Sequence, residues 1–235
     1  MSKFIKVLKE NKREIALSII SIVACFTYFY VSKIIDLPYF RASFVKIVMF
    51  IIIPTLYLFM IKERKAVKEF FKIKNIKDIK VGIITVIGVI FISAISLFTI
   101  SNVDFFENLA KEASNTINMS LTKYIITSIY IICVNALVEE YFFRGIVFLQ
   151  LSKGKNKKFA MFFSALLFSL YHIAIFEPGM HFIMYLLGYL GLFITGLIFN
   201  CMDIKSKTIY NSWLVHAIAN SSINTIGLYI LLRLK

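Results

Sequence analysis

Acidic residues, proline, glycine and cysteine are all scarce in this chain. Of its 235 residues only 13 are Asp or Glu, against 27 Lys or Arg, and it contains 3 prolines and 9 glycines. No Gly-, Pro- or Ser-rich linker divides the sequence, and it has neither an internal repeat nor a low-complexity tract. We therefore expect a single polytopic domain over residues 1–235.

Two further absences exclude partners. The three cysteines, Cys25, Cys133 and Cys201, lie within or at the ends of apolar runs and lack the spacing of a metal site. They are interpreted as buried free thiols. The net charge of +14 is not matched by a continuous basic face with interleaved aromatic residues, because Lys and Arg occupy the gaps between apolar runs. No nucleic-acid partner is expected.

Long hydrophobic runs are the main feature of the sequence. The chain is 59% hydrophobic with a mean hydropathy of +0.80, above the roughly 45–50% apolar content of soluble domains. Continuous rather than alternating runs indicate helices, each able to cross a hydrocarbon core of about 30 Å. The sequence predicts an all-α integral membrane protein, a bundle of seven or eight transmembrane helices. The expected spans are residues 15–31, 44–61, 79–100, 123–149, 159–176, 182–202 and 208–232, and a break at Asn220–Ser222 would supply the eighth.

Charge placement predicts the orientation. Lys and Arg crowd the first fourteen residues and the loop after the second run, whereas residues 101–122 carry Asp104, Glu107 and Glu112. The N-terminus is therefore expected in the cytoplasm, and the richness in Ile, Lys, Phe and Asn favours a bacterial plasma membrane. Residues 66–80 fit a short amphipathic helix in the headgroup plane or a solvated loop.

Three apolar runs contain polar motifs. The fourth carries Val138–Arg144 (VEEYFFR), the fifth carries Phe168–His172 (FSLYH) and the seventh carries His216–Asn220 (HAIAN). Ionisable groups inside spans are costly and usually mark a pathway, a relay or a catalytic centre. From the expected cytoplasmic ends, Glu139 lies about 16 Å deep, His172 about 20 Å and His216 about 12 Å. We expect the three motifs to meet in one intramembrane polar cavity.

Helical spacing assigns neighbours within these motifs. Glu140 and Arg144 are separated by four residues and can neutralise each other, whereas Glu139 is turned away by about 100° towards another partner. His216 and Asn220 likewise share one helix face.

This set of residues leaves two hydrolytic chemistries open. A carboxylate and an imidazole that share a water act together as a general base, and a second His with an Asn amide can stabilise an oxyanion. Alternatively, two His and one carboxylate form a common catalytic zinc set, which here would be Glu139, His172 and His216.

The three motifs together resemble those of the CAAX-protease and bacteriocin-processing family. The matching pattern is Glu-Glu-x-x-x-Arg, then Phe-x-x-x-His, then His-x-x-x-Asn, over roughly Lys123 to Asn224. Members of this group, also called Abi or type II CAAX prenyl endopeptidases, are multispan intramembrane proteases. The resemblance implies variable N-terminal spans over residues 1–121 and a catalytic core over residues 122–235.

The resemblance implies a role for each residue of this chain that matches a motif position. Glu139 and His172 would activate water, and His216 and Asn220 would form the oxyanion site. Glu140 and Arg144 would orient the catalytic helix, and Phe168 and Phe143 would line the substrate pocket. The substrate would be a peptide or membrane protein, in peptide maturation, bacteriocin self-immunity or signalling control. The resemblance makes no cofactor certain, a divalent metal such as zinc remains an option, and no oligomeric state is indicated.

Other interpretations compete with this one. Glu140 and Arg144 can be a structural ion pair, His172 a core histidine and Asn220 a residue that joins helices. Two rival functions are a proton-coupled transporter that uses Glu139, His172 and His216 as a relay, and a non-catalytic scaffold that regulates a signalling protein.

Overall fold

The computed structural model describes residues 11–73, 75–101, 120–172 and 182–233, and these ranges contain helices and turns but no strand. Each of the seven predicted apolar runs is helical where it is described, while residues 173–176 and the acidic loop with Asp104, Glu107 and Glu112 lie outside the described residues. The elements are α2 Lys12–Phe29, η1 Tyr30–Ile34, α3 Tyr39–Ile47, η2 Val48–Ile52, α4 Ile53–Met60, α5 Lys65–Phe70, η3 Ile76–Asp78, α6 Lys80–Ser101, α8 Leu121–Tyr130, η4 Ile131–Asn135, α9 Ala136–Glu140, η5 Tyr141–Leu149, α10 Lys157–His172, α11 Phe182–Ser206 and α12 Tyr210–Arg233.

The chain forms two compact units. The first contains residues 1–78 and 138–209, and the second contains residues 79–137 and 210–235. The continuous helix Leu121–Leu149 passes from the second unit into the first. The predicted division at residues 121 and 122 therefore concerns the sequence family rather than these units, and it stays a prediction.

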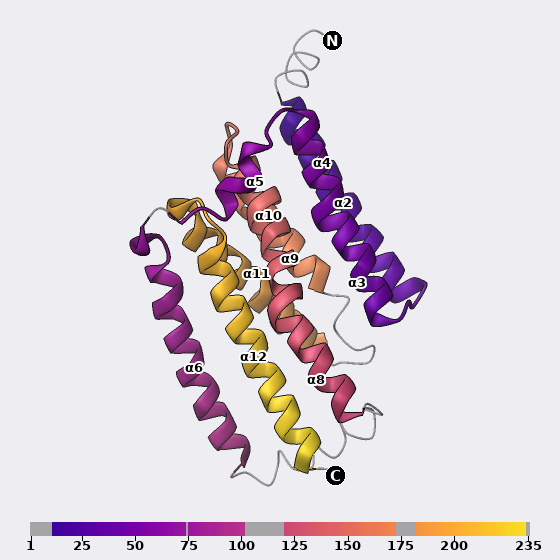
Figure 1. Cartoon of the computed structure of the whole chain (residues 1–235), viewed down its shortest axis with the longest axis vertical. Helices are drawn as coiled ribbons and strands as arrows, with labels where there is room; N and C mark the ends of the chain where they lie inside the picture. Colours follow the sequence, from indigo (N-terminus) through magenta and orange to yellow (C-terminus); the bar gives the residue numbers. More distant parts are fainter. Residues whose placement is uncertain (1–10, 74, 102–119, 173–181, 234–235) are drawn as a thin grey trace. The chain divides into compact units, whose positions relative to one another are not determined.

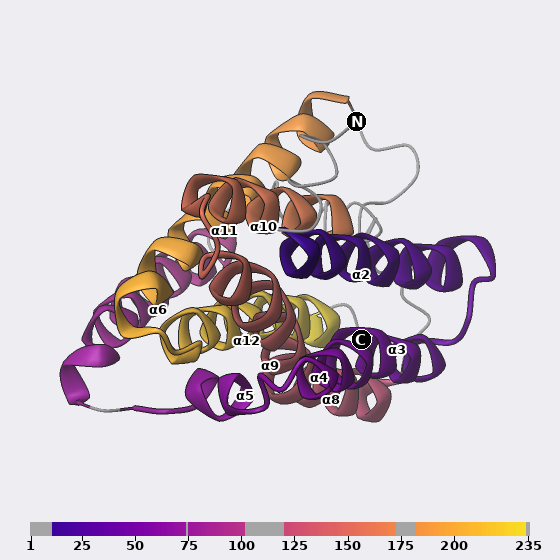
Figure 2. The ribbon, with the colours of Figure 1, turned by 90° about the horizontal axis from the view of Figure 1, so that it is seen from above.

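Helices α2 and α3–η2–α4 lie side by side in the first unit, as Figures 1 and 2 both show. Helix α10 packs against α2, η5 and α11. Its contact with α11 is close because Gly196 lacks a side chain: a Cβ there would lie 2.9 Å from the Cα of Ala165. Small residues allow this kind of close backbone approach between helices in lipid.

Aromatic rings fill the interior of the first unit. Phe50 of η2 stacks on Phe142 of η5 with a centroid separation of 4.0 Å, and it meets Phe143 and Tyr171 at 5.6 Å and 5.4 Å. Such pairs stabilise by about 0.5–1.5 kcal/mol beyond their buried area. This cluster joins the N-terminal helices to the two helices that carry the first two polar motifs.

The second unit is held together by hydrogen bonds from polar residues of α12. The side chain of Asn211 accepts a hydrogen bond of 3.0 Å from the backbone N–H of Gly82 in α6, and Asn224 accepts one of 2.8 Å from Ser128 in α8. Figure 1 shows α6 and α12 running alongside each other. Helix α12 is continuous, so the expected break at Asn220–Ser222 is wrong. The Ser222 hydroxyl donates to the Ile218 carbonyl within the helix.

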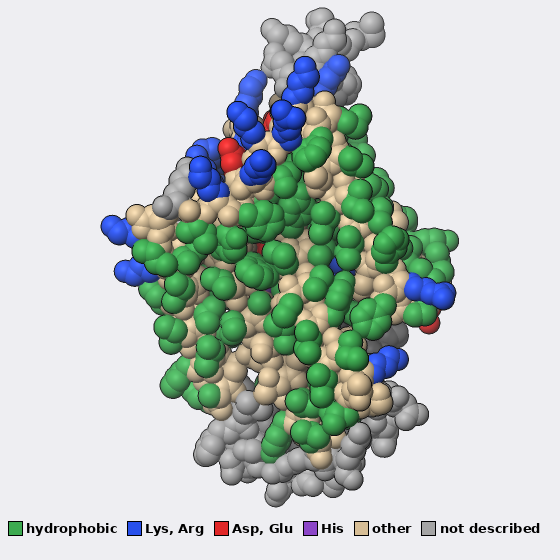
Figure 3. Space-filling view, in the orientation of Figure 1, with side chains coloured by type: hydrophobic (Ala, Val, Ile, Leu, Met, Phe, Trp, Pro, Cys, Tyr) green, Lys and Arg blue, Asp and Glu red, His purple; other side chains and the backbone are tan. Residues whose placement is uncertain are grey.

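Among the described residues, four helices are long and apolar enough to cross a membrane: Lys12–Ile34, Tyr39–Met60, Leu121–Leu149 and Tyr185–Ser206. Helix Lys80–Ile95 is apolar but shorter. In the first unit, hydrophobic side chains cover the flanks of the helices, and Lys and Arg gather where α4 leads into α5 (Figure 3). The described residues are thus helical with four candidate spans, and a total of seven spans stays a prediction.

Residues 66–80 combine both forms expected of them. A short helix, α5, buries Ala66 and Phe70, and a 3₁₀ turn follows at Ile76–Asp78. The carbonyl of Phe70 accepts hydrogen bonds from the Thr208 hydroxyl and the Ile209 backbone N–H, which fixes the end of α5 against the residues that follow α11.

The contact between α10 and α11 predicts that a Gly→Ala substitution affects stability differently at two positions of α11. Gly196→Ala should destabilise the protein by about 1–3 kcal/mol because the new methyl group meets backbone. Gly191→Ala, where a Cβ meets nothing within 4 Å, should be neutral or stabilise by up to about 1 kcal/mol. Thermal unfolding of the two purified variants in one detergent checks this, and equal shifts would contradict the packing.

Candidate functional site

The first polar motif sits where an α-helix changes into a π-helix. Glu139 and Glu140 end α9, and the nine residues of η5 follow directly. π-Helical turns are rare and are frequently found at functional sites. Successive residues on a helix point in different directions, so the two glutamates have different neighbours.

Glu139 lies at the centre of a buried polar cluster in the first unit. Its side chain is only 1% exposed. The Oε1 atom accepts a hydrogen bond of 2.9 Å from the Tyr171 hydroxyl, and the Lys46 ammonium lies 3.2 Å from the same oxygen. Lys46, on α3, is 3% exposed and also lies over the rings of Tyr28 and Tyr171 at 4.6 Å and 5.1 Å.

The second carboxylate oxygen faces His172 of α10. The distance from His172 Nε2 to Glu139 Oε2 is 3.5 Å. The other ring nitrogen, Nδ1, lies 2.7 Å from the Phe168 carbonyl oxygen. Because a carbonyl only accepts, Nδ1 carries a hydrogen in this contact, and Nε2 is the ring nitrogen that faces Glu139. Two acceptors that face each other at this distance can share a proton or a water.

Glu140 and Arg144 form the i,i+4 ion pair that their spacing predicts. Arg144 Nε lies 3.1 Å from Glu140 Oε2, and both side chains are fully buried. The guanidinium also lies over the rings of Phe168 and Phe199 at 4.2 Å and 4.8 Å. Phe168 in turn meets the His172 ring at 4.3 Å and Phe143 at 5.3 Å. The pair and these rings thus support the α10 segment that carries His172.

The third polar motif belongs to the second unit. His216 is 8% exposed. The Asn220 amide donates to the Ile131 carbonyl of η4 at 3.5 Å, the long limit of a hydrogen bond, and the Asn220 carbonyl accepts 2.8 Å from Asn224. The first unit brings Glu139, Glu140, Arg144, His172, Phe168 and Phe143 together; the convergence of His216 and Asn220 with them stays a prediction.

The first unit alone does not provide a metal centre. Among its described residues no group of three or more His, Cys, Asp and Glu is arranged to hold an ion, whereas a catalytic zinc takes three protein ligands. Glu139 and His172 are two donors, and the carboxylate already faces an ammonium. The expected third ligand, His216, lies in the second unit, so the zinc set remains a prediction and no chemical step is derived through a metal.

Sequence reasoning missed Lys46 and underrated Tyr171. Lys46 lies 93 residues from Glu139 in the sequence, and its motif-free surroundings gave no local pattern. One signal was present, since Lys46 is an ionisable residue inside the second apolar run. Tyr171 directly precedes His172, but nothing in the sequence shows that its hydroxyl reaches Glu139.

Residues 121–222 match the family model described as type II CAAX prenyl endopeptidase Rce1-like. Over these residues, the chain is similar to the CAAX-protease family. No curated protein and no solved structure matches it. The matched residues include all six of the predicted catalytic positions, from Glu139 to Asn220, whereas Lys46 lies outside the match.

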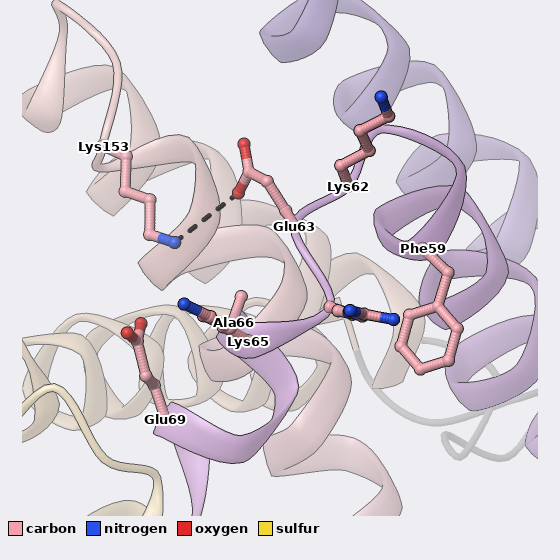
Figure 4. Close-up of a pocket in the computed structure, with 8 residues that line it drawn as sticks. Phe59, Lys62, Glu63, Lys65, Ala66, Glu69 and Lys153 are labelled. Atoms are coloured by element: carbon pink, nitrogen blue, oxygen red, sulfur yellow. Dashed lines mark ion pairs between the residues drawn. The ribbon is translucent and has the colours of Figure 1, made fainter.

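A second charged cluster of the first unit joins three chain segments. Arg13 of α2 donates to both carboxylate oxygens of Glu63 at 2.6 Å and 2.9 Å, and it also donates to the backbone and side-chain oxygens of Gln150. Glu63 and the nearby Lys153, 3.6 Å apart, line a pocket of about 800 Å³ (Figure 4). The other lining residues are Phe59, Lys62, Arg64, Lys65, Ala66 and Glu69.

The cluster predicts an acid-dependent loss of stability. Burial alone would raise the pKa of Glu63, but the hydrogen bonds and charge of Arg13, with Lys153, lower this pKa below its ordinary value of 4.5. A lowered pKa in the folded state stabilises the protein above about pH 4.5, and the contribution disappears as the pH falls through the lowered value.

The measurement is thermal unfolding of the native protein and Glu63→Gln between pH 3 and pH 7. The native protein should be more stable at neutral pH, and the difference should shrink at the acidic end. Glu69→Gln is the control, because Glu69 lines the same pocket without an ion pair among the described residues. A difference that stays constant with pH would contradict the assignment.

The Glu140–Arg144 pair predicts a non-additive double mutant. Breaking a buried pair by removing one partner costs about 3–5 kcal/mol. Arg144→Met should be the worse single change, since the charges of Glu140 and Asp203 both act on Arg144. The double variant Glu140→Gln/Arg144→Met should be more stable than Arg144→Met alone.

Thermal unfolding of the two single variants and the double variant gives this cycle. The matched control is the partly exposed pair Glu63–Lys153, where Lys153→Met should cost less than about 1 kcal/mol. Additive losses at Glu140 and Arg144 would show that the pair is not coupled.

Proposed function

We propose that this chain is an intramembrane endopeptidase in which Glu139 and His172 activate the attacking water. The observation that carries the proposal is the 3.5 Å distance between Glu139 Oε2 and His172 Nε2, with His172 Nδ1 bound to the Phe168 carbonyl. A water between these two acceptors donates one hydrogen to either, and its oxygen lone pair is then directed at a substrate carbonyl.

The reaction is an amide hydrolysis. The water oxygen bonds to the carbonyl carbon while its proton passes to the Glu139–His172 pair, and the carbonyl oxygen becomes an oxyanion. The C–N bond then breaks as the pair returns the proton to the amine nitrogen. Fixed hydrogen-bond donors around the oxyanion supply much of the rate enhancement in such reactions.

His216 and Asn220 are the proposed oxyanion donors. Both are polar residues on one face of α12 and lie within the matched family region. The Asn220 amide makes only a 3.5 Å bond to Ile131, so turning it towards an oxyanion breaks a weak interaction. Glu140 and Arg144 hold the helix in position, and Phe168 and Phe143 line the substrate pocket.

The proposed substrate is a membrane-associated peptide or protein. The family description names prenylated CAAX termini, and peptide maturation, bacteriocin self-immunity or control of a signalling protein fit the membrane location equally. The proposal includes seven membrane spans in the bacterial plasma membrane with the N-terminus in the cytoplasm, because Lys and Arg gather at the α4–α5 end of the first unit. Residues 122–235 would form the catalytic core.

Proteolysis by point variants tests the active site. The purified protein in liposomes is incubated with an internally quenched peptide that carries a prenylated cysteine and with an unmodified transmembrane peptide. Glu139→Gln and His172→Ala should each lower kcat by at least about 10²-fold because the general base is lost. His216→Ala and Asn220→Ala should lower kcat by about 10²–10³-fold if they bind the oxyanion.

Two controls make this test decisive. Tyr185→Phe on α11 should leave cleavage unchanged, and native cleavage in the presence of a chelator separates the water-activating pair from a zinc set of Glu139, His172 and His216. Cleavage that survives Glu139→Gln would overturn the proposal. Proton-coupled solute uptake that Glu139→Gln abolishes, without cleavage of either peptide, would favour the transporter.

A further inference from the structure

The buried ammonium of Lys46 belongs to the Glu139 cluster but lies outside the three family motifs. Lys46 lies on α3 within the candidate span Tyr39–Met60, and it is 3% exposed. A lysine inside a span is costly unless it is paired or serves a function. Its presence therefore needs a reason beyond the packing of α3.

The contacts of Lys46 indicate that it orients the Glu139 carboxylate. The ammonium lies 3.2 Å from Glu139 Oε1, and the Tyr171 hydroxyl donates 2.9 Å to the same oxygen. Both donors thus approach one carboxylate oxygen, and this arrangement turns the other oxygen, Oε2, to His172 Nε2 at 3.5 Å. The side of Glu139 that binds Lys46 determines the side that is presented to the imidazole.

The rings around Lys46 restrict where the ammonium can go. It lies over Tyr28 at 4.6 Å and over Tyr171 at 5.1 Å, and these two rings contact each other with centroids 5.2 Å apart. A cation over an aromatic face is attracted by the negative charge of the ring face, most strongly when it is desolvated. The ammonium is therefore held beside Glu139 by three separate contacts.

The charges of the cluster balance in pairs. Glu140 is neutralised by Arg144 at 3.1 Å, and Lys46 is the cation that faces Glu139 at 3.2 Å. A buried ion that loses its partner is neutralised by a proton or destabilises the fold. The ion pair with Lys46 therefore ties the position of the Glu139 carboxylate to α3.

We propose that Lys46 is a positioning residue for hydrolysis, which holds the Oε1 atom of Glu139 and turns its Oε2 atom towards His172. The inference rests on the proposed function and extends it beyond residues 121–222, to a residue of the N-terminal helices. It also means that the positive charge beside the reactive carboxylate is supplied by the protein chain itself.

Steady-state kinetics on the quenched prenylated peptide test the proposal with three substitutions. Lys46→Met keeps the length of the side chain and removes its charge, Lys46→Arg keeps the charge, and Lys33→Met is the control at an exposed lysine of η1. Lys46→Met should lower kcat at least about 100-fold with KM within about threefold of native, which is the range expected for loss of a general base. Lys46→Arg should recover kcat to within about tenfold of native, and Lys33→Met should match native.

The outcomes separate this inference from the proposed function. Native kcat in Lys46→Met, with Glu139→Gln inactive, overturns the role of Lys46 and leaves the peptidase standing. Full activity in Glu139→Gln instead overturns the peptidase mechanism itself. A raised KM with native kcat in Lys46→Met assigns Lys46 to substrate binding and also overturns the inference.

A folding defect has its own test. If Lys46→Met does not fold, Lys46→Gln is compared with the native protein instead, because it also removes the charge but keeps a polar side chain. A lowered kcat at native KM in this folded variant supports the positioning role, and native kcat overturns it.

Discussion

The first unit is organised by the need to bury a negative charge in an apolar interior. Glu139 is almost inaccessible to solvent, and its carboxylate is bounded by an ammonium, a phenol hydroxyl and an imidazole. These groups come from α3 and α10 and approach the carboxylate from different sides. Because an uncompensated ion would be costly there, the helices that carry the three groups must pack in one arrangement. The aromatic cluster around Phe50 fills the space that this arrangement leaves.

Adjacent glutamates have separate tasks because a helix turns about 100° per residue. Glu140 forms an ion pair with Arg144 of the same helical segment. The Arg144 guanidinium is covered by two rings from α10 and α11. Glu139 faces the other way and keeps an oxygen towards His172. One glutamate thus stabilises the framework, and the next is left available for chemistry.

Local spacing was sufficient to predict part of this site. The Glu140–Arg144 pair follows from four-residue spacing, and helices were found at each apolar run because long runs leave little choice of structure. The pairing of Lys46 with Glu139, or of Tyr171 with the same oxygen, depends on how separate helices rotate against one another, which no local pattern encodes. The continuity of α12 through Asn220–Ser222 was missed for a related reason. Serine hydroxyls can bond to carbonyls of their own helix, as Ser222 does, so polar residues need not end a helix.

The π-helical stretch from Tyr141 to Leu149 makes the site sensitive to chain length as well as to side-chain identity. In this stretch the backbone bonds reach one residue further than in an α-helix. Loss of a single residue there would either return the stretch to α-helical winding or, with the winding kept, rotate the helix on one side of the deletion relative to the other. Gln150, anchored by Arg13 beyond the stretch, would then be out of phase with Glu139. This segment should therefore accept conservative substitutions far more readily than insertions or deletions in the course of evolution.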